Sequence, residues 1–464
     1  MGNFGNKWNK FVQIFIEKNG YVKVVQGLQN TLLIAVVGML IGVLIGTIIA
    51  TVRVLPKYKT LPRALNAVCS FYVGLFRGTP MVVQLLIFYY VMLPLMGINE
   101  FVRMWVADME FGVAPEILDE LRKRIDRRIF GYTGVYTHDY YNSFSKWCKE
   151  HYDWSFPEEE LCFTPGIIPA LYQLTETLCN KDEKVLMNTP AYGYFLHSAE
   201  YAGVDVLQSP LKKKPDGTFE LDYENFEQQC ANPQCKMVFW CNPQNPTGRM
   251  WTEEELRRIA GIVEKYNLWI VSDEIHCDLI RCGRKHIPMA KVMTSYPKLI
   301  TCMAPSKTFN LAGLAFSNII IRDPVLRERF KERDKLFGMV NPMSLTAAKA
   351  AYDKGGAWHE ELKQYLDANF AFVKDFFDKN LPDAVMYIPE ATYLAWVDLS
   401  KCLPDVEDLP DFFANKAGVL LEGGNSLFVG NAAGYIRLNL AMPRSILKTG
   451  LERMRDTINA HNKH

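Results

Sequence analysis

Three side chains that could take part in a reaction follow three separate apolar stretches of this 464-residue sequence. Asn245 lies in the segment NPQNPTG (242–248), Asp273 begins DEIH (273–276), and Lys307 lies in APSKTFN (304–310). An amine can form an imine with an aldehyde, a carboxylate can keep a pyridine nitrogen protonated, and an amide can donate to a ring oxygen. The three groups together predict a site for pyridoxal 5'-phosphate, in which catalytic Lys307 holds the cofactor as a Schiff base.

A binding site for the cofactor phosphate is predicted in TPGIIP (164–169), which follows one apolar stretch and begins a helix. Gly166 allows the backbone to approach a ligand closely, and N–H groups at a helix start, here Ile167 and Ile168, bind phosphate well. Tyr192, in PAYGY (190–194), is the best candidate for a ring that stacks on the pyridine.

Each of these residues alone has a plainer interpretation. Lys307 could be a solvated surface charge, Asp273 a helix N-cap, and Asn245 a turn residue before proline. Tyr192 could be a core aromatic residue, and His276 could be a core histidine. Their joint occurrence, in order and each after a predicted strand, favours the cofactor site.

The elements that must position these residues alternate between short apolar strands and amphipathic helices from about residue 102 onward, which is typical of an α/β domain. We predict strands at residues 161–163, 184–187, 237–241, 268–272 and 299–303. Thr252 and Glu255 have the spacing of a helix capping box. Ligands of open α/β sheets bind beyond the carboxyl ends of the strands, where the three side chains converge. A smaller α/β domain is predicted to begin at residue 345 with one long helix, 345–380.

The motifs NPQNPTG, SDEIH and APSKTFNLAGL resemble those of fold-type I pyridoxal-phosphate enzymes of aminotransferase class I/II. The segments MWVADMEF (104–111), FGYT (130–133) and DEIHCD (273–278) are similar to one branch, the cystathionine β-lyase or cysteine-S-conjugate β-lyase group called MalY/PatB. The likeness runs from about residue 102 to the C-terminus. It implies a mixed-sheet large domain over 102–344 and a small C-terminal domain over 345–464.

The resemblance also implies further site residues. Arg437, in GYIRLN (434–439), would bind the substrate carboxylate with a two-pronged hydrogen bond. Ser306 would contact the phosphate, and His276 would lie near the ring oxygen. Tyr132 would reach the phosphate of a neighbouring subunit, which implies a homodimer. The segment that usually precedes MWVADM in this branch is replaced here, which a gene fusion or an error of sequence assembly would produce.

The first hundred residues contain two uncharged stretches, from which we predict transmembrane helices at about 28–52 and 78–98 within a segment 1–101. A pair of buried core helices is the alternative. We expect a basic loop between them. The segments QGLQNT (26–31) and FRGTPMVVQ (76–84) resemble the start of a polar amino-acid ABC-transporter permease. That likeness covers about 8–100 and ends before the coupling region, which implies a truncated permease.

Net charge and cysteine content limit which classes of partner and which cellular compartment the sequence favours. The net charge of +1 argues against a nucleic-acid partner. Ten of the eleven cysteines follow residue 140, without CxxC pairing, which favours a reducing cytosol and no metal site. We therefore expect membrane association through 28–98 with a cytoplasmic enzyme domain, or a cytoplasmic protein if the N-terminal segment is artefactual.

The function that we expect is β-elimination from L-cystathionine or a related cysteine S-conjugate, giving a thiol, pyruvate and ammonia. A class I/II aminotransferase would use the same residues and is the nearest alternative. Two alternatives of other classes are a transporter permease component, which the apolar stretches suggest, and a regulator-binding protein, which the branch resemblance suggests.

Overall fold

A computed structural model gives the fold of residues 20–55, 60–78, 83–84, 101–281, 283–334 and 340–463. The chain divides into two compact units, Met1–Asn99 and Glu100–His464. All residues predicted to do chemistry belong to the second unit.

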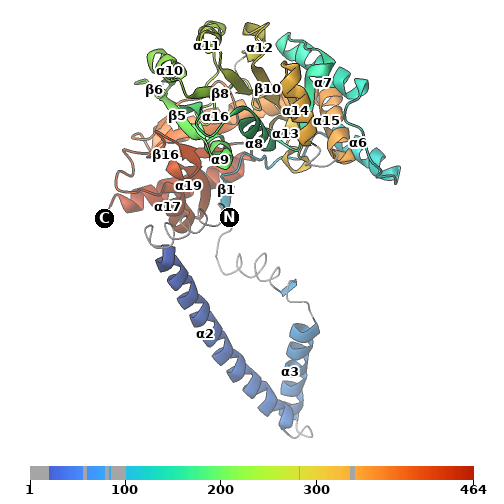
Figure 1. Cartoon of the computed structure of the whole chain (residues 1–464). Coiled ribbons are helices and arrows are strands. Elements are labelled where there is room, and N and C mark those ends of the chain that lie inside the picture. Colours follow the sequence, from blue (N-terminus) through green and yellow to red (C-terminus); the bar gives the residue numbers. More distant parts are fainter. Residues whose placement is uncertain are drawn as a thin grey trace. The chain divides into compact units, whose positions relative to one another are not determined.

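Helices α2 (Gly20–Val54) and α3 (Thr60–Gly78) make up most of the described part of the first unit (Figure 1). Within α2, Gly27–Val54 is long and apolar enough to cross a membrane, by length and composition. This stretch matches the predicted span 28–52. The other predicted span, 78–98, falls almost entirely outside the described residues, so a pair of transmembrane helices is not confirmed.

The basic segment that the sequence suggested to be a loop is helical in α3. Its exposed apolar residues Leu61, Leu65 and Val68 recur at helical spacing. An amphipathic pattern of this kind favours a helix even where several residues are basic. The segment Thr60–Gly78 is therefore a helix and not the loop that was predicted there.

The second unit is built on a seven-stranded sheet with the strand order β2-β11-β10-β9-β8-β3-β5. Strand β11 runs antiparallel to both of its neighbours, and the other pairings are parallel. The sheet is therefore mixed, which confirms the predicted α/β class. Its strands are β2 (Leu161–Thr164), β3 (Lys184–Thr189), β5 (Asp205–Pro210), β8 (Cys235–Cys241), β9 (Trp269–Asp273), β10 (Leu299–Met303) and β11 (Ser317–Ile321).

Both faces of this sheet are buried. Along β8, Val238 and Trp240 belong to one apolar cluster, whereas Met237 and Phe239 belong to another. This alternation puts successive side chains on opposite faces, each covered by helices. The first cluster includes residues of α7 (His138–Tyr152), α11 (Glu253–Lys265), α12 (Met289–Val292) and α15 (Pro342–Lys354); the second includes residues of α8 (Ile167–Leu178), α9 (Gly193–Ala202) and α14 (Pro324–Asp334).

A second, five-stranded sheet has the order β1-β14-β16-β13-β12 and its own apolar core. Its first strand, β1 (Val102–Met104), comes from the start of the unit, ahead of the large sheet in sequence. The other strands are β12 (Val385–Met386), β13 (Leu394–Asp398), β14 (Val419–Gly423) and β16 (Tyr435–Asn439), and helices α16 (Gly356–Asn380), α17 (Leu409–Ala417) and α19 (Arg444–His461) contribute to this core.

Shorter elements connect these layers. Strands β4 (Ala191–Tyr192) and β15 (Phe428–Val429) pair, which joins a loop of the large sheet to a loop of the small one. The remaining elements are α6 (Pro115–Asp126), α10 (Tyr223–Cys230), α13 (Pro305–Thr308), α18 (Gly424–Leu427), the 3-10 turns η3 (Glu158–Glu160) and η4 (Ala312–Leu314), and the ribbon of β6 (Lys212–Lys213) and β7 (Phe219–Glu220).

The five strands predicted from the sequence all occur, with bounds shifted by at most a few residues. The capping box of α11 is also present, since Thr252 and Glu255 each accept a backbone hydrogen bond from the other. The single helix predicted over 345–380 is instead broken at Gly355, between α15 and α16. The ring of Phe309 packs there, and a Cβ on Gly355 would lie 2.4 Å from Phe309 Cε1.

Candidate functional site

A cavity of about 410 Å³ lies where β8, β9 and β10 end, and nearly every predicted site residue lines it. The residues were expected at this edge because the carboxyl ends of parallel strands lie together. The predicted residues that line the cavity are Gly166, Ile167, Ile168, Tyr192, Asn245, Asp273, His276, Ser306, Lys307 and Arg437.

Lys307 lies in the short helix α13, directly after β10. Its Nζ donates to the carbonyl oxygen of Ala107 over 2.6 Å. Burial lowers the pKa of Lys307 from 10.5 to about 8; the Asp108 carboxylate opposes this effect and the Arg437 guanidinium adds to it. The next residue, Thr308, donates to Asp278 Oδ2 over 2.7 Å, which anchors the turn that carries the lysine. The amine is therefore held in place and is a better nucleophile at neutral pH than an exposed lysine.

Asp273 ends β9 and is 6% exposed. Burial raises its pKa to about 7, although its Oδ1 accepts the N–H of Ile275 over 3.2 Å. A buried carboxylate of this kind gains most from a cationic or N–H partner. A protonated pyridine nitrogen would supply such a partner.

Arg437, on β16, is 2% exposed and lies beside Asn245, which follows β8. Arg437 Nη1 donates to Asn245 Oδ1 over 3.2 Å. The guanidinium also lies 5.2 Å from the ring centroid of Phe428 and forms an ion pair with Glu422. Burial lowers the pKa of Arg437 to about 10, so the group remains cationic at neutral pH.

His276 is 2% exposed, and its Nδ1 has no hydrogen-bond partner within the described parts of the chain. Burial lowers its pKa to about 3, and the nearby cations Lys307 and Arg437 lower it further. The ring is neutral at physiological pH. A buried imidazole nitrogen without a partner suits a polar ligand group in the cavity.

Helix α8 begins at this cavity. Gly166, its N-cap, has φ +104°, which an L-residue with a side chain rarely adopts. Among the described residues no side chain caps this helix start, so the N–H groups of its first turn, including those of Ile167 and Ile168, can bind an anion. Ser306 lines the same cavity.

Tyr192 and Tyr194 both line the cavity, with ring centroids 5.2 Å apart. Burial raises the pKa of Tyr192 to about 12, so its hydroxyl stays protonated. Tyr132 differs from the other predicted residues because it is 95% exposed and does not line the cavity of its own chain. Its role toward a neighbouring subunit stays a prediction.

Sequence reasoning missed three contributors. The carbonyl of Ala107 accepts hydrogen bonds from Lys307 and from the Tyr393 hydroxyl, at 2.6 and 2.8 Å. The negative charge of Asp108 raises the pKa of Lys307. Glu422 lines the cavity and pairs with Arg437. The first two lie in MWVADMEF, whose likeness to one enzyme branch was the available signal, whereas Glu422 carried none.

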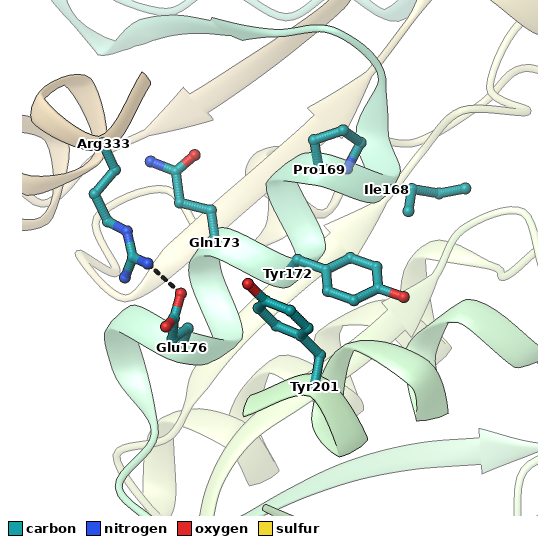
Figure 2. A pocket seen from close by; sticks show the side chains of 7 residues that line it. All are labelled: Ile168, Pro169, Tyr172, Gln173, Glu176, Tyr201 and Arg333. Carbon is teal, nitrogen blue, oxygen red and sulfur yellow. Dashed lines mark hydrogen bonds and ion pairs between the residues drawn. The ribbon is translucent and has the colours of Figure 1, made fainter. Parts of the chain in front are cut away.

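A second cavity, of about 390 Å³, lies beside the first and shares Ile168 and Pro169 with it (Figure 2). Its charged residues Arg333 and Glu176 form an ion pair with each other, as Figure 2 shows. It contains no lysine or buried acid, so the chemistry predicted from the sequence belongs to the first cavity. In the described part of the chain, no group of three or more His, Cys, Asp or Glu side chains could hold a metal ion.

The first cavity fits pyridoxal phosphate in its chemistry. It combines an amine of lowered pKa, a buried acid, a buried imidazole nitrogen without a partner, and a helix start at a glycine of positive φ. These groups correspond to the aldehyde, the pyridine nitrogen, the ring substituents and the phosphate.

Comparison with known proteins agrees with this chemistry. The profile of the family "Aminotransferase class I and II" matches residues 100–454. Cystathionine beta-lyase PatB of Bacillus subtilis is 35% identical over 367 residues, which cover 78% of this chain and 93% of that protein. The structure of the PLP-bound C-S lyase from Staphylococcus hominis has 42% identity and a TM-score of 0.75, covering 77% of this chain and 91% of that chain. Cystalysin from Treponema denticola, which contains a pyridoxal 5'-phosphate cofactor, has 34% identity and a TM-score of 0.75, covering 78% of this chain and 92% of that one.

Proposed function

This chain belongs to the class I and II aminotransferase family, and on that premise we propose that it is a pyridoxal-phosphate-dependent carbon–sulfur β-lyase. Its substrate would be L-cystathionine or a related cysteine S-conjugate, and its products a thiol, pyruvate and ammonia. The observation that carries the proposal is the convergence of Lys307, Asp273 and Arg437 on one cavity. The likeness to PatB and to the Staphylococcus hominis lyase supports the C–S lyase reaction over others of the family.

Pyridoxal phosphate supplies an electron-accepting ring that stabilises negative charge at the substrate Cα. The residues that would hold it are Lys307 at the aldehyde, Asp273 at the pyridine nitrogen, and the start of α8 at the phosphate. Asn245 and His276 would face the ring substituents, with Tyr192 against the ring. The shared position of these residues around one cavity supports the assignments.

The substrate's α-carboxylate would bind Arg437, which remains cationic inside the cavity. Lys307, as a free amine, would remove the proton from Cα, for which its lowered pKa suits it. The electron pair left at Cα would form a Cα=Cβ bond as the Cβ–S bond breaks, and the thiolate would leave with the electrons of the Cβ–S bond. The remaining three-carbon fragment is hydrolysed to pyruvate and ammonia.

The test is pyruvate release from L-cystathionine by the purified chain, with the Lys307→Ala variant as control. We expect steady pyruvate production by the wild type, none above background by the variant, and loss of the cofactor's near-visible absorbance in the variant. Absence of pyruvate from the fully loaded wild type would contradict the lyase proposal. Conversion of an added 2-oxo acid that depends on an amino acid, without pyruvate, would favour the aminotransferase alternative.

We further propose that the enzyme unit acts as a homodimer, in which Tyr132 serves the neighbouring site. Its 95% exposure leaves the side chain free to enter the site of a neighbouring subunit. Sedimentation of Tyr132→Ala, together with its affinity for pyridoxal phosphate, tests the proposal. Weaker cofactor affinity in a dimer of unchanged size is the expected result.

We also propose that residues 28–98 associate with a membrane and leave the enzyme unit in the cytoplasm. The length and apolar character of Gly27–Val54 support this, whereas the family match begins only at residue 100. Extraction of membranes with carbonate tests it: the wild-type chain should stay in the pellet, and a chain without residues 1–100 should move to the supernatant. The permease resemblance and the implied fusion stay predictions.

A further inference from the structure

Glu422 is a cavity carboxylate whose position opposite Arg437 is fixed by strand pairing. The two residues are partners in the antiparallel register of β14 and β16. Glu422 Oε2 forms an ion pair with Arg437 Nη2, and the side chains of Glu422 and Arg437 are 19% and 2% exposed. Both line the cavity that would receive the substrate. The arginine proposed to bind the substrate carboxylate is thus already paired with a carboxylate of its own chain.

The remaining donors of Arg437 show which edge of the guanidinium a substrate can use. Nη1 donates to Asn245 Oδ1 over 3.2 Å. Nη2 faces Glu422 and is 3.4 Å from the carbonyl oxygen of Trp105. Nε is buried and, within the described residues, has no hydrogen-bond partner. On the edge formed by Nε and Nη2, Nε is thus buried without a partner and Nη2 is in the ion pair with Glu422, whose Oε2 is buried as well.

A carboxylate that binds arginine through two parallel hydrogen bonds needs both N–H groups of one edge. On the Nε–Nη2 edge it would take Nη2 from Glu422. Two carboxylates on the same guanidinium edge repel each other in a poorly solvated cavity. Binding of the substrate carboxylate and pairing of Glu422 with Arg437 therefore compete.

We propose that Glu422 is a carboxylate latch, that is, an internal competitor which occupies Arg437 until the substrate's α-carboxylate displaces it. The proposal rests on the proposed function for the identity of the ligand that Arg437 binds. In the free enzyme, Glu422 neutralises the buried guanidinium of Arg437, because a buried charge without a partner would destabilise the fold. It lowers the affinity for every carboxylate ligand and leaves ligands without a carboxylate unaffected.

The test measures ligand affinity without turnover. The ligand is 3-(methylthio)propanoate, which has the carboxylate and the thioether of an S-conjugate but no amine to react. Its dissociation constant is measured by titration calorimetry on the loaded full-length enzyme for wild type, Glu422→Gln, and the surface control Glu361→Gln. Expected is at least about 10-fold tighter binding by Glu422→Gln, because a hydrogen bond to a charged group contributes about that much. The control should match the wild type.

The neutral ligand 3-(methylthio)propanamide separates the latch from a general opening of the cavity. Its affinity should be the same in wild type and Glu422→Gln. Equal affinities of both enzymes for the propanoate, or an equal gain for the propanamide, would overturn the proposal. If Glu422→Gln does not fold, Glu422→Asp takes its place, because a carboxylate one methylene shorter pairs less closely; a smaller gain in propanoate affinity is then expected, and no gain overturns the proposal.

The two proposals fail separately in this design. Pyruvate release by the wild type reports the lyase reaction and does not depend on the latch. Propanoate affinity reports the competition at Arg437 and does not require turnover. Loss of pyruvate with intact competition would therefore contradict the lyase assignment alone, and the reverse result would contradict the latch alone.

Discussion

The reactivity of Lys307 toward pyridoxal phosphate should depend on a pKa well below that of an ordinary lysine. The neutral amine is the form that attacks the aldehyde. With the pKa lowered from 10.5 to about 8, about half of the amine is neutral at pH 8. With the ordinary value, only about one molecule in 300 would be neutral at that pH, since each pH unit changes the ratio tenfold.

The assay is the rate of covalent capture of pyridoxal phosphate by the apoprotein between pH 6 and pH 10, followed by absorbance. We expect the rate constant to rise with pH and to reach half its plateau at about pH 8. Asp108 raises the pKa of Lys307 through its negative charge, so Asp108→Asn should move the midpoint to lower pH. The exposed Asp126→Asn variant should leave the midpoint unchanged.

Two outcomes would refute this reasoning. A midpoint close to 10.5 would mean that the amine is solvated and that burial does not control it. A midpoint that rises in Asp108→Asn would mean that this carboxylate does not stabilise the charged amine, contrary to the sign of the Coulomb interaction.

Three further predictions concern the arginine, a glycine and a helix cap. Arg437→Lys should raise KM for L-cystathionine at least about tenfold, because an ammonium cannot form the two parallel hydrogen bonds of a guanidinium; an unchanged KM in steady-state assays would contradict carboxylate binding by Arg437. Gly248→Ala should destabilise the fold by more than about 1 kcal/mol in urea unfolding, since φ is +69° and the new Cβ would lie 2.5 Å from Pro389 Cβ; equal stability would show that this turn relaxes freely. Thr252→Ala should cost about 0.5–2 kcal/mol in the same assay through loss of the capping box of α11, and Thr252→Asp should recover most of it.

The parts of the site that the sequence predicted are those whose position follows from strand order. Asp273 ends a buried parallel strand, and Asn245 and Lys307 each follow one. Parallel strands bring their carboxyl ends to one edge whatever the details of packing. Their types then fit one cofactor. Nothing beyond local pattern and this rule was needed to place them together.

The parts that the sequence did not predict depend on contacts between distant segments. Glu422 reaches Arg437 only because β14 and β16 pair in one particular register. The carbonyl of Ala107 meets Lys307 across 200 residues of sequence. At the break between α15 and α16, the Gly355-Gly356 pair was a local signal, whereas the packing of Phe309 against Gly355 is not visible in the sequence. Such contacts are determined by tertiary packing, which the periodicity of helices and strands does not predict.

The most direct test of the central claim is to quantify every product made from L-cystathionine by the loaded full-length chain. The account predicts homocysteine, pyruvate and ammonia in equal amounts, none of which forms with Lys307→Ala. A 2-oxo acid that retains the whole carbon–sulfur skeleton, without homocysteine, would contradict it, because the Cβ–S bond would then have survived the reaction.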